Sequence, residues 1–190
     1  MGVPEIKAIR TVATTRFFRI EELDLRFANG VERTYERLPG VGTAAVMVVP
    51  VNERGEILLI REYCAGFHEF QLTLVKGASE PDESLEDAAN RELKEEIGMG
   101  ARRIQFVKRL NIAPGHMGFT INVLLATDLY PEQLPADEPE PPELVPWPLE
   151  RLDELLCGAE FREARAIAAL YLVRSLIPEA LGRESDSQTN

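Results

Sequence analysis

Residues 77–99 constrain the fold of this chain most strongly, because a glycine-containing loop leads there into a strongly acidic helix. Ser84 is typical of a helix N-cap with Asp87 three residues later, and Gly98 is typical of the residue that follows a helix. Apolar residues recur between these ends at helical spacing, namely Leu85, Ala88, Ala89, Leu93 and Ile97. The sequence therefore predicts a helix from Leu85 to Ile97 with one face packed on a core.

Three glutamates of this helix, Glu92, Glu95 and Glu96, stand at i, i+3 and i+4 and so point to one side. That side borders the apolar stripe at the helix C-terminus, where the dipole disfavours each negative charge by about 0.3–1 kcal/mol. Arg91 would pair with Asp87 or Glu95, but one guanidinium does not neutralise three carboxylates. We therefore expect the glutamates to bind a divalent cation, for which clustered oxygen ligands favour Mg²⁺ or Mn²⁺ over zinc. The alternative is a solvated acidic face on a surface helix.

The spacing of these residues matches the Nudix box. It reads Gly77-x5-Glu83-x7-Arg91-Glu92-Leu93-x-Glu95-Glu96-x-Gly98-Met99, with Leu93 and Met99 in the aliphatic positions. The chain therefore resembles the Nudix hydrolase superfamily. This resemblance implies an α/β fold, the Nudix α/β/α sandwich with a mixed sheet. It also implies hydrolysis of a nucleoside diphosphate linked to another group, with divalent metals bound by the box glutamates.

Segments outside the box, together with residues 88–96 within it, resemble bacterial hydrolases of ADP compounds in this superfamily. They are residues 33–37, 59–63, 88–96, 128–132 and 137–141. The resemblance implies hydrolysis of the pyrophosphate bond in ADP-ribose, NADH or diadenosine triphosphate with release of AMP. Two or three Mg²⁺ ions are expected, with Mn²⁺ as a substitute. A Nudix hydrolase for nucleotide sugars such as ADP-sugars, and a non-catalytic nucleotide sensor on the same fold, stay open as alternatives.

The resemblance also implies roles for single residues. The backbone carbonyl of Lys76 would join the metal shell, although many relatives carry a small or apolar residue at this position. Glu69 and Pro114 would lie near the substrate. A general base would come from the loop after a late strand, where Glu138 and Glu140 are the candidates.

Further residues are expected to complete or support the site. Arg61 alternates out from the apolar residues of a strand at 57–63, where it would bind a phosphate bidentately or form a surface ion pair. Glu95 and Glu96 are expected to be catalytic through the metal. Glu83 would orient Arg91 or a metal-bound water. The residues expected to support the site are Gly77, Glu83, Arg91 and Gly98.

The net charge limits the kinds of molecule that this protein is expected to bind. A formal net charge of -11 over 190 residues argues against a surface that binds nucleic acid. Cys64 and Cys157 have no metal-ligand spacing and are typical of reduced thiols. The sequence shows neither an apolar signal region nor a run of membrane-spanning length. We expect a cytoplasmic protein that binds a small ADP-containing molecule and neither nucleic acid nor a membrane.

Residues 1–40 are predicted to form a separate β unit, since alternating apolar residues precede the Asn29-Gly30 pair, a strong hairpin signal. A small antiparallel unit rarely stands alone in water. We therefore expect this unit to take part in a homodimer, and the alternative is that it covers its own chain. A Nudix domain over 41–177 and a flexible tail over 178–190 would follow.

The remaining elements are predicted from periodicity. Residues 44–51 form a continuous apolar run, which is typical of a strand buried on both faces. The proline-rich residues 130–148 predict a solvated acidic loop. A helix is expected over 161–176, with a packed side made of Ala164, Ile167, Ala168, Tyr171 and Val173.

Overall fold

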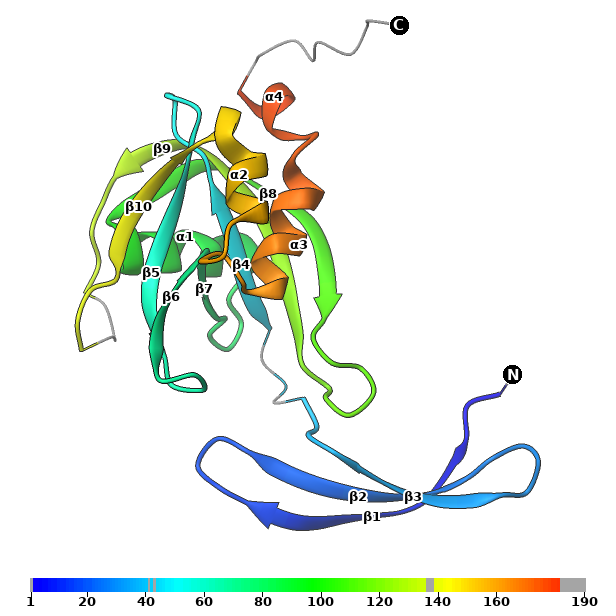
Figure 1. The fold of residues 1–190 in the computed structure, drawn as a ribbon. Helices are drawn as coiled ribbons and strands as arrows, with labels where there is room; N and C mark the ends of the chain where they lie inside the picture. The colour runs from blue at the N-terminus through cyan, green and yellow to red at the C-terminus, as the bar shows by residue number, and fades with distance from the viewer. Residues whose placement is uncertain (1, 41, 43, 136–138, 182–190) are drawn as a thin grey trace, which may run out of the picture. The chain divides into compact units, whose positions relative to one another are not determined.

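The computed structural model describes residues 2–40, 42, 44–135 and 139–181 (Figure 1). The chain divides into two compact units. The first contains Met1–Thr43 and Asn111–Thr120, and the second contains Ala44–Leu110 and Ile121–Asn190. No signal in the sequence places residues 111–120 with the first unit.

The first unit is built on a three-stranded antiparallel sheet in the order β1-β2-β3 (Figure 1). Its strands are β1 (Glu5–Thr14), β2 (Arg19–Arg26) and β3 (Glu32–Arg37). The β2–β3 turn closes with a 2.9 Å hydrogen bond from the Gly30 N–H to the Phe27 carbonyl, and Gly30 has a φ of 82°. The predicted hairpin at Asn29-Gly30 is confirmed, because glycine reaches this left-handed conformation without a steric cost.

The second unit contains a mixed sheet in the order β7-β4-β9-β8. Its strands are β4 (Ala45–Pro50), β7 (Val75–Ala78), β8 (Met99–Asn111) and β9 (Thr120–Pro131). Strand β4 pairs antiparallel with β7 and parallel with β9. Residues 46–50 are all buried, which confirms the predicted fully buried strand. A second sheet has the order β10-β5-β6, with β5 (Glu56–Cys64), β6 (Glu69–Thr73) and β10 (Glu143–Pro148).

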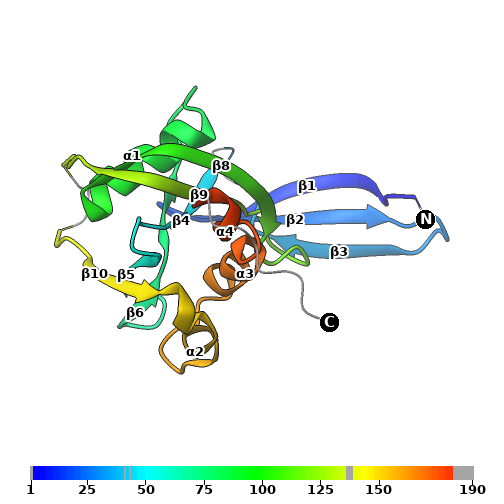
Figure 2. The ribbon, with the colours of Figure 1, turned by 90° about the horizontal axis from the view of Figure 1, so that it is seen from above.

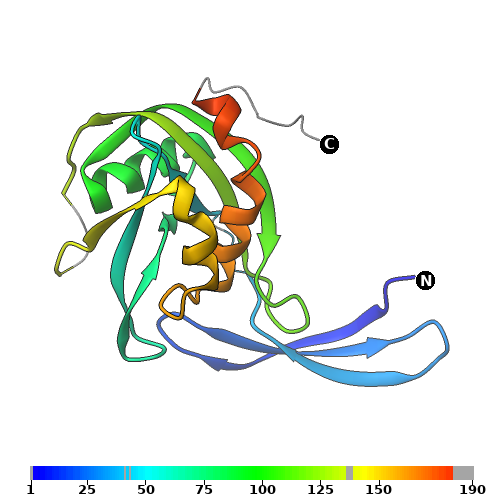
Figure 3. The ribbon, with the colours of Figure 1, turned by 45° about the horizontal axis from the view of Figure 1, so that its top comes forward.

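Helices cover both faces of the mixed sheet (Figures 2 and 3). Val46 and Val48 of β4 pack in one core with helix α1 (Leu85–Ile97). Met47 and Val49 point to the opposite face and pack with α2 (Leu152–Cys157) and α3 (Ala164–Val173). The expected α/β/α sandwich is thereby confirmed. The short helices are η1 (Leu149–Arg151) and α4 (Ile177–Ala180). None of the helices in the described ranges is long and apolar enough to cross a bilayer.

Two expectations about the C-terminal third are wrong in part. Residues 143–148 form the strand β10, which pairs with β5, and not a loop. Proline is tolerated there because β10 lies at the edge of its sheet. Helix α3 buries Ala166, Ala169, Leu170 and Val173. Of the residues predicted to pack, Val173 is buried and Ile167 packs partly buried against the core, whereas Ala164 is exposed and Tyr171 is 57% exposed. The predicted packed face is therefore correct only in part.

Candidate active site

Helix α1 begins and ends where local sequence signals place it. The Ser84 hydroxyl accepts a 3.0 Å hydrogen bond from the backbone N–H of Asp87 and so caps the N-terminus. At the other end Gly98 has a φ of 67°, and its N–H bonds the Leu93 carbonyl. Both caps confirm the predicted bounds.

The last turn of α1 has a second, distant cap. The Gln133 side-chain amide donates to the carbonyls of Lys94 (3.0 Å) and Glu95 (3.2 Å), and the Leu134 N–H also donates to the Lys94 carbonyl. These carbonyls have no partner inside the helix. Sequence reasoning did not find Gln133, since it lies 39 residues from Lys94.

Arg91 organises most of the box acids. It donates to both Glu83 oxygens (3.0 and 3.1 Å), to Glu92 (2.9 Å), to Glu95 (2.9 Å) and to the Ala78 carbonyl (2.8 Å). The expected pair of Arg91 with Glu95 is confirmed, and Asp87, the other expected partner, accepts a hydrogen bond from the Ser84 hydroxyl. The hydrogen bonds of Arg91 hold the pKa of Glu83 below the ordinary value. Glu83 thus fixes Arg91, and Arg91 fixes two box glutamates.

Gly77 leaves room for one of these glutamates. Glu92 is only 8% exposed, and a Cβ at Gly77 would overlap its carboxylate. Gly77 lies on β7 opposite Val46 of β4, so the backbone has little freedom to move away. Burial raises the pKa of Glu92, against the hydrogen bond from Arg91. Glycine is therefore required at position 77 because a side chain there would occupy the space of the Glu92 carboxylate.

Glu96 stands apart from the Arg91 network. Within the described ranges, its buried Oε2 atom has no hydrogen-bond partner. Burial raises the pKa of Glu96 to about 8, and the charge of Lys76 opposes that rise. The Lys76 ammonium itself pairs with Glu62. Glu96 is thus a partly buried side chain with one buried, unpartnered oxygen, and it has no counter-ion of its own among the described residues.

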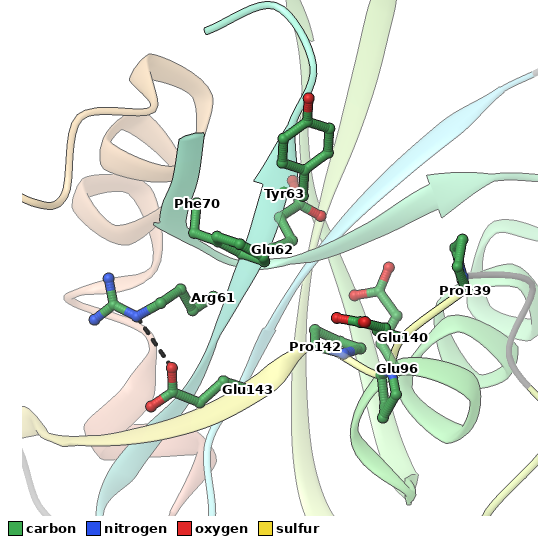
Figure 4. A pocket seen from close by; sticks show the side chains of 10 residues that line it. Arg61, Glu62, Tyr63, Phe70, Glu96, Pro139, Glu140, Pro142 and Glu143 are labelled. Atoms are coloured by element: carbon green, nitrogen blue, oxygen red, sulfur yellow. Dashed lines mark ion pairs between the residues drawn. The ribbon is translucent and has the colours of Figure 1, made fainter. Parts of the chain in front are cut away.

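A pocket of about 600 Å³ opens beside Glu96 (Figure 4). Its wall comes from β5, from β6, from α1 and from residues 139–143. Tyr63 and Phe70 contribute exposed rings whose centroids lie 5.9 Å apart in an edge contact. The Tyr63 hydroxyl lies 2.8 Å from His68 Nδ1, which fixes its ring. The pocket therefore joins an acidic end to an aromatic end.

The structure brings several predicted site residues together in this pocket. Arg61, Glu96 and Glu140 all line it. Arg61 is engaged with carboxylates, at 3.2 Å from Glu143 (Figure 4). It also lies 3.4 Å from Glu160. Glu138 lies outside the described residues.

Two predicted substrate-binding residues are not among the described lining of this pocket. Glu69 accepts a hydrogen bond from Gln71 (2.9 Å) and pairs with Arg162, and it is not part of the pocket lining described above. Pro114 belongs to the segment Asn111–Thr120 of the first unit. Conversely, sequence reasoning did not find Glu62 or Phe70, because their place in the pocket depends on how β5 pairs with β6.

The donor set fits a hard divalent cation. Across the described part of the chain, no three His, Cys, Asp or Glu side chains form a preassembled metal cage. Arg91 accounts for this, since it already holds two box glutamates. All the same, the acids outnumber the nearby cations, Arg91 and Lys76. These acids are Glu62, Glu83, Glu92, Glu95 and Glu96. The excess of negative oxygen donors, with one buried oxygen unpartnered, suits Mg²⁺ or Mn²⁺.

Comparison with known proteins agrees with this site. Residues 42–170 match the NUDIX domain, and residues 4–37 match the NudE-type Nudix hydrolase N-terminal domain. The chain belongs to the Nudix hydrolase family. The ADP compounds hydrolase NudE of Escherichia coli (strain K12) is 47% identical to this Nudix chain over 171 residues, which cover 90% of this chain and 91% of the relative.

Two further relatives extend the comparison. The ADP-ribose pyrophosphatase of Bacillus subtilis (strain 168) is 26% identical over 164 residues, or 85% of each chain. A crystal structure of an ADP compounds hydrolase superposes on this Nudix hydrolase with a TM-score of 0.91. The two chains are 44% identical, and the match covers 97% of this chain and 98% of the chain in that crystal structure. The family and fold predicted from the box are confirmed, and the chain is a Nudix pyrophosphatase of a family that generally needs a divalent metal.

Proposed function

We propose that this Nudix hydrolase cleaves the pyrophosphate bond of ADP-linked compounds such as ADP-ribose, NADH and diadenosine triphosphate. The products are AMP and the other phosphorylated half. The observation that carries this proposal is the pocket, in which the box residue Glu96 and the exposed rings of Tyr63 and Phe70 line one cavity. Aromatic side chains stack on nucleobases, whatever the base. The similarity to an ADP compounds hydrolase and to an ADP-ribose pyrophosphatase supports the same class of substrate.

Mg²⁺ is the cofactor of this proposal, with two or three ions and with Mn²⁺ as a substitute. Glu92, Glu95, Glu96 and the backbone carbonyl of Lys76 would hold the ions. Bound there, divalent ions neutralise diphosphate oxygens and lower the pKa of an attacking water. Arg91 and Glu83 keep two of the ligands in place through the hydrogen bonds described above.

The pocket offers a base and a phosphate ligand. Glu140 lines the same cavity as Glu96 and would accept the proton of the attacking water. Glu138 stays an alternative for this role. Arg61 would exchange Glu143 or Glu160 for a phosphate, with which guanidinium forms bidentate hydrogen bonds. Glu69 and Pro114 stay predictions for substrate binding.

The test is a panel of substrates with Mg²⁺ and with EDTA. AMP release is measured from ADP-ribose, NADH, diadenosine triphosphate and ADP-sugars, with Glu96→Gln as the impaired control. We expect turnover of the first three, its loss in EDTA, and at least about a hundredfold lower kcat in the variant. A clear preference for ADP-sugars would favour the nucleotide-sugar hydrolase. Nucleotide binding without turnover of any compound would favour the sensor.

We also propose that the protein is a homodimer in which the first unit takes part. Strand β1 of this unit and the β1–β2 connection keep several large apolar side chains about half exposed or more. They are Ile6, Ile9, Val12, Phe17 and Phe18. Contiguous exposed apolar surface is typical of protein–protein contacts.

A further inference from the structure

Lys76 forms a largely enclosed ion pair beside the box glutamates. Its Nζ atom contacts Glu62, and the two side chains are only 17% and 27% exposed. Lys76 lies on β7 next to Gly77, and Glu62 lies on β5 in the pocket wall. The pair therefore connects the strand that leads into the box with the wall of the pocket.

The other cation of the site is fully engaged. Arg91 serves Glu83, Glu92 and Glu95, so it leaves no donor for the remaining acids. Glu96, whose Oε2 atom is buried without a partner among the described residues, lines the same pocket as Glu62, the partner of Lys76. Lys76 is thus the positive charge paired with Glu62 in the wall of the pocket that Glu96 also lines.

We propose that the Lys76 ammonium is a resident counter-ion that competes with the divalent metal and sets its affinity. It neutralises Glu62 and keeps a positive charge in the wall of the site, so an incoming cation meets a weaker negative field. Lys76 is a positioning residue here, since it acts through Glu62. The inference rests on the metal site of the proposed function and deepens it, because it assigns control of metal loading to a single side chain.

The experiment measures Mn²⁺ binding to the full-length chain by electron paramagnetic resonance, without substrate. Lys76→Met removes the charge and keeps the chain length. We expect it to lower the Kd for Mn²⁺ on the order of tenfold, because a unit charge a few ångströms away changes the interaction with a divalent ion by that order. Lys76→Arg keeps the charge and should leave the Kd close to the parent value.

Glu62→Gln should change the Kd for Mn²⁺ in the opposite direction. It removes a negative charge and releases the ammonium, so it should raise the Kd. The double variant Lys76→Met/Glu62→Gln should return towards the parent, since the two changes cancel in charge. This double-mutant cycle separates the pair from either residue alone.

An unchanged or raised Kd in Lys76→Met would overturn the proposal, as would a parent that binds no Mn²⁺. If Lys76 instead binds a substrate phosphate, Lys76→Met raises KM and leaves the Kd unchanged. Melting curves report whether the variants fold, and Lys76→Gln replaces Lys76→Met if the latter does not. Failure of the proposed substrate class leaves Mn²⁺ binding unaffected, so the two failures are distinguishable.

Discussion

Glu96 differs from Glu83, Glu92 and Glu95 because it lies outside the ion pairs of Arg91. Glu92 and Glu95 share Arg91, whereas the Oε2 atom of Glu96 has no partner among the residues described. A buried carboxyl group avoids the cost of an isolated charge by keeping its proton. In the absence of metal, Glu96 is therefore a group that favours the neutral form at physiological pH.

The pH dependence of stability follows from this residue. Between its ordinary pKa of 4.5 and its raised pKa of about 8, folded Glu96 keeps a proton that the unfolded chain releases. The free energy of unfolding of the metal-free protein should therefore fall as pH rises through this window, by at most about 1.4 kcal/mol per pH unit. Urea unfolding in EDTA across the window measures this fall.

Glu96→Gln should remove most of this slope, because the amide does not titrate. Glu86→Gln is the matched control, since Glu86 is an exposed residue in the first turn of the same helix and should leave the slope in place. Equal slopes in the parent and in Glu96→Gln would contradict the assignment to Glu96.

At the scale of elements, helix α1 depends on residues far from it in sequence. The Gln133 amide satisfies two carbonyls of its last turn. Gln133→Ala should lower the free energy of unfolding by about 1–2 kcal/mol, since these carbonyls then lose a partner. Chemical denaturation measures this loss. Gln105→Ala, at an exposed position on β8, serves as control, and equal losses in both variants would argue against the cap.

The β5–β6 hairpin carries the aromatic end of the pocket. Phe70→Ala should raise KM about fivefold or more with little change in kcat, because stacking on a base contributes about 1–3 kcal/mol. Steady-state kinetics with ADP-ribose measure KM and kcat separately. Phe67→Ala is the control, since Phe67 is more exposed, at 75%, and is not among the described pocket residues. The same rise in KM in both variants would contradict the stacking role.

Local signals predicted the elements that depend on local chemistry. Ser84 and Gly98 mark the two ends of α1. Both were predictable because a hydroxyl cap and a left-handed glycine act on residues that are close in sequence. The predicted packed face of α3 was wrong in part because that face depends on where the core lies. A tyrosine such as Tyr171 can pack in a core or stay exposed, so its residue type does not decide between the two. The pairing of Lys76 with Glu62 and the cap by Gln133 join distant segments and have no signal in the sequence around them.

At the scale of the whole molecule, the proposed dimer makes a direct prediction. Light scattering after size exclusion should give twice the monomer mass of 21.3 kDa. Ile9→Glu places a charge on half-exposed apolar surface of β1 and should shift the protein towards the monomer, since a buried charge is costly. Thr14→Glu, at the end of β1, should not. A parent that is monomeric at every concentration would rule out the dimer.

Gly77 has a consequence for relatives of this chain whose activity is unknown. Its place on β7 gives no backbone reason for glycine, and the requirement comes from the Glu92 carboxylate that occupies the volume of a missing side chain. A larger residue at this position fills the space that the Glu92 carboxylate occupies, even in a chain that retains every box glutamate. Inspection of this one position should therefore sort silent nucleotide binders from working enzymes more sharply than counting their glutamates.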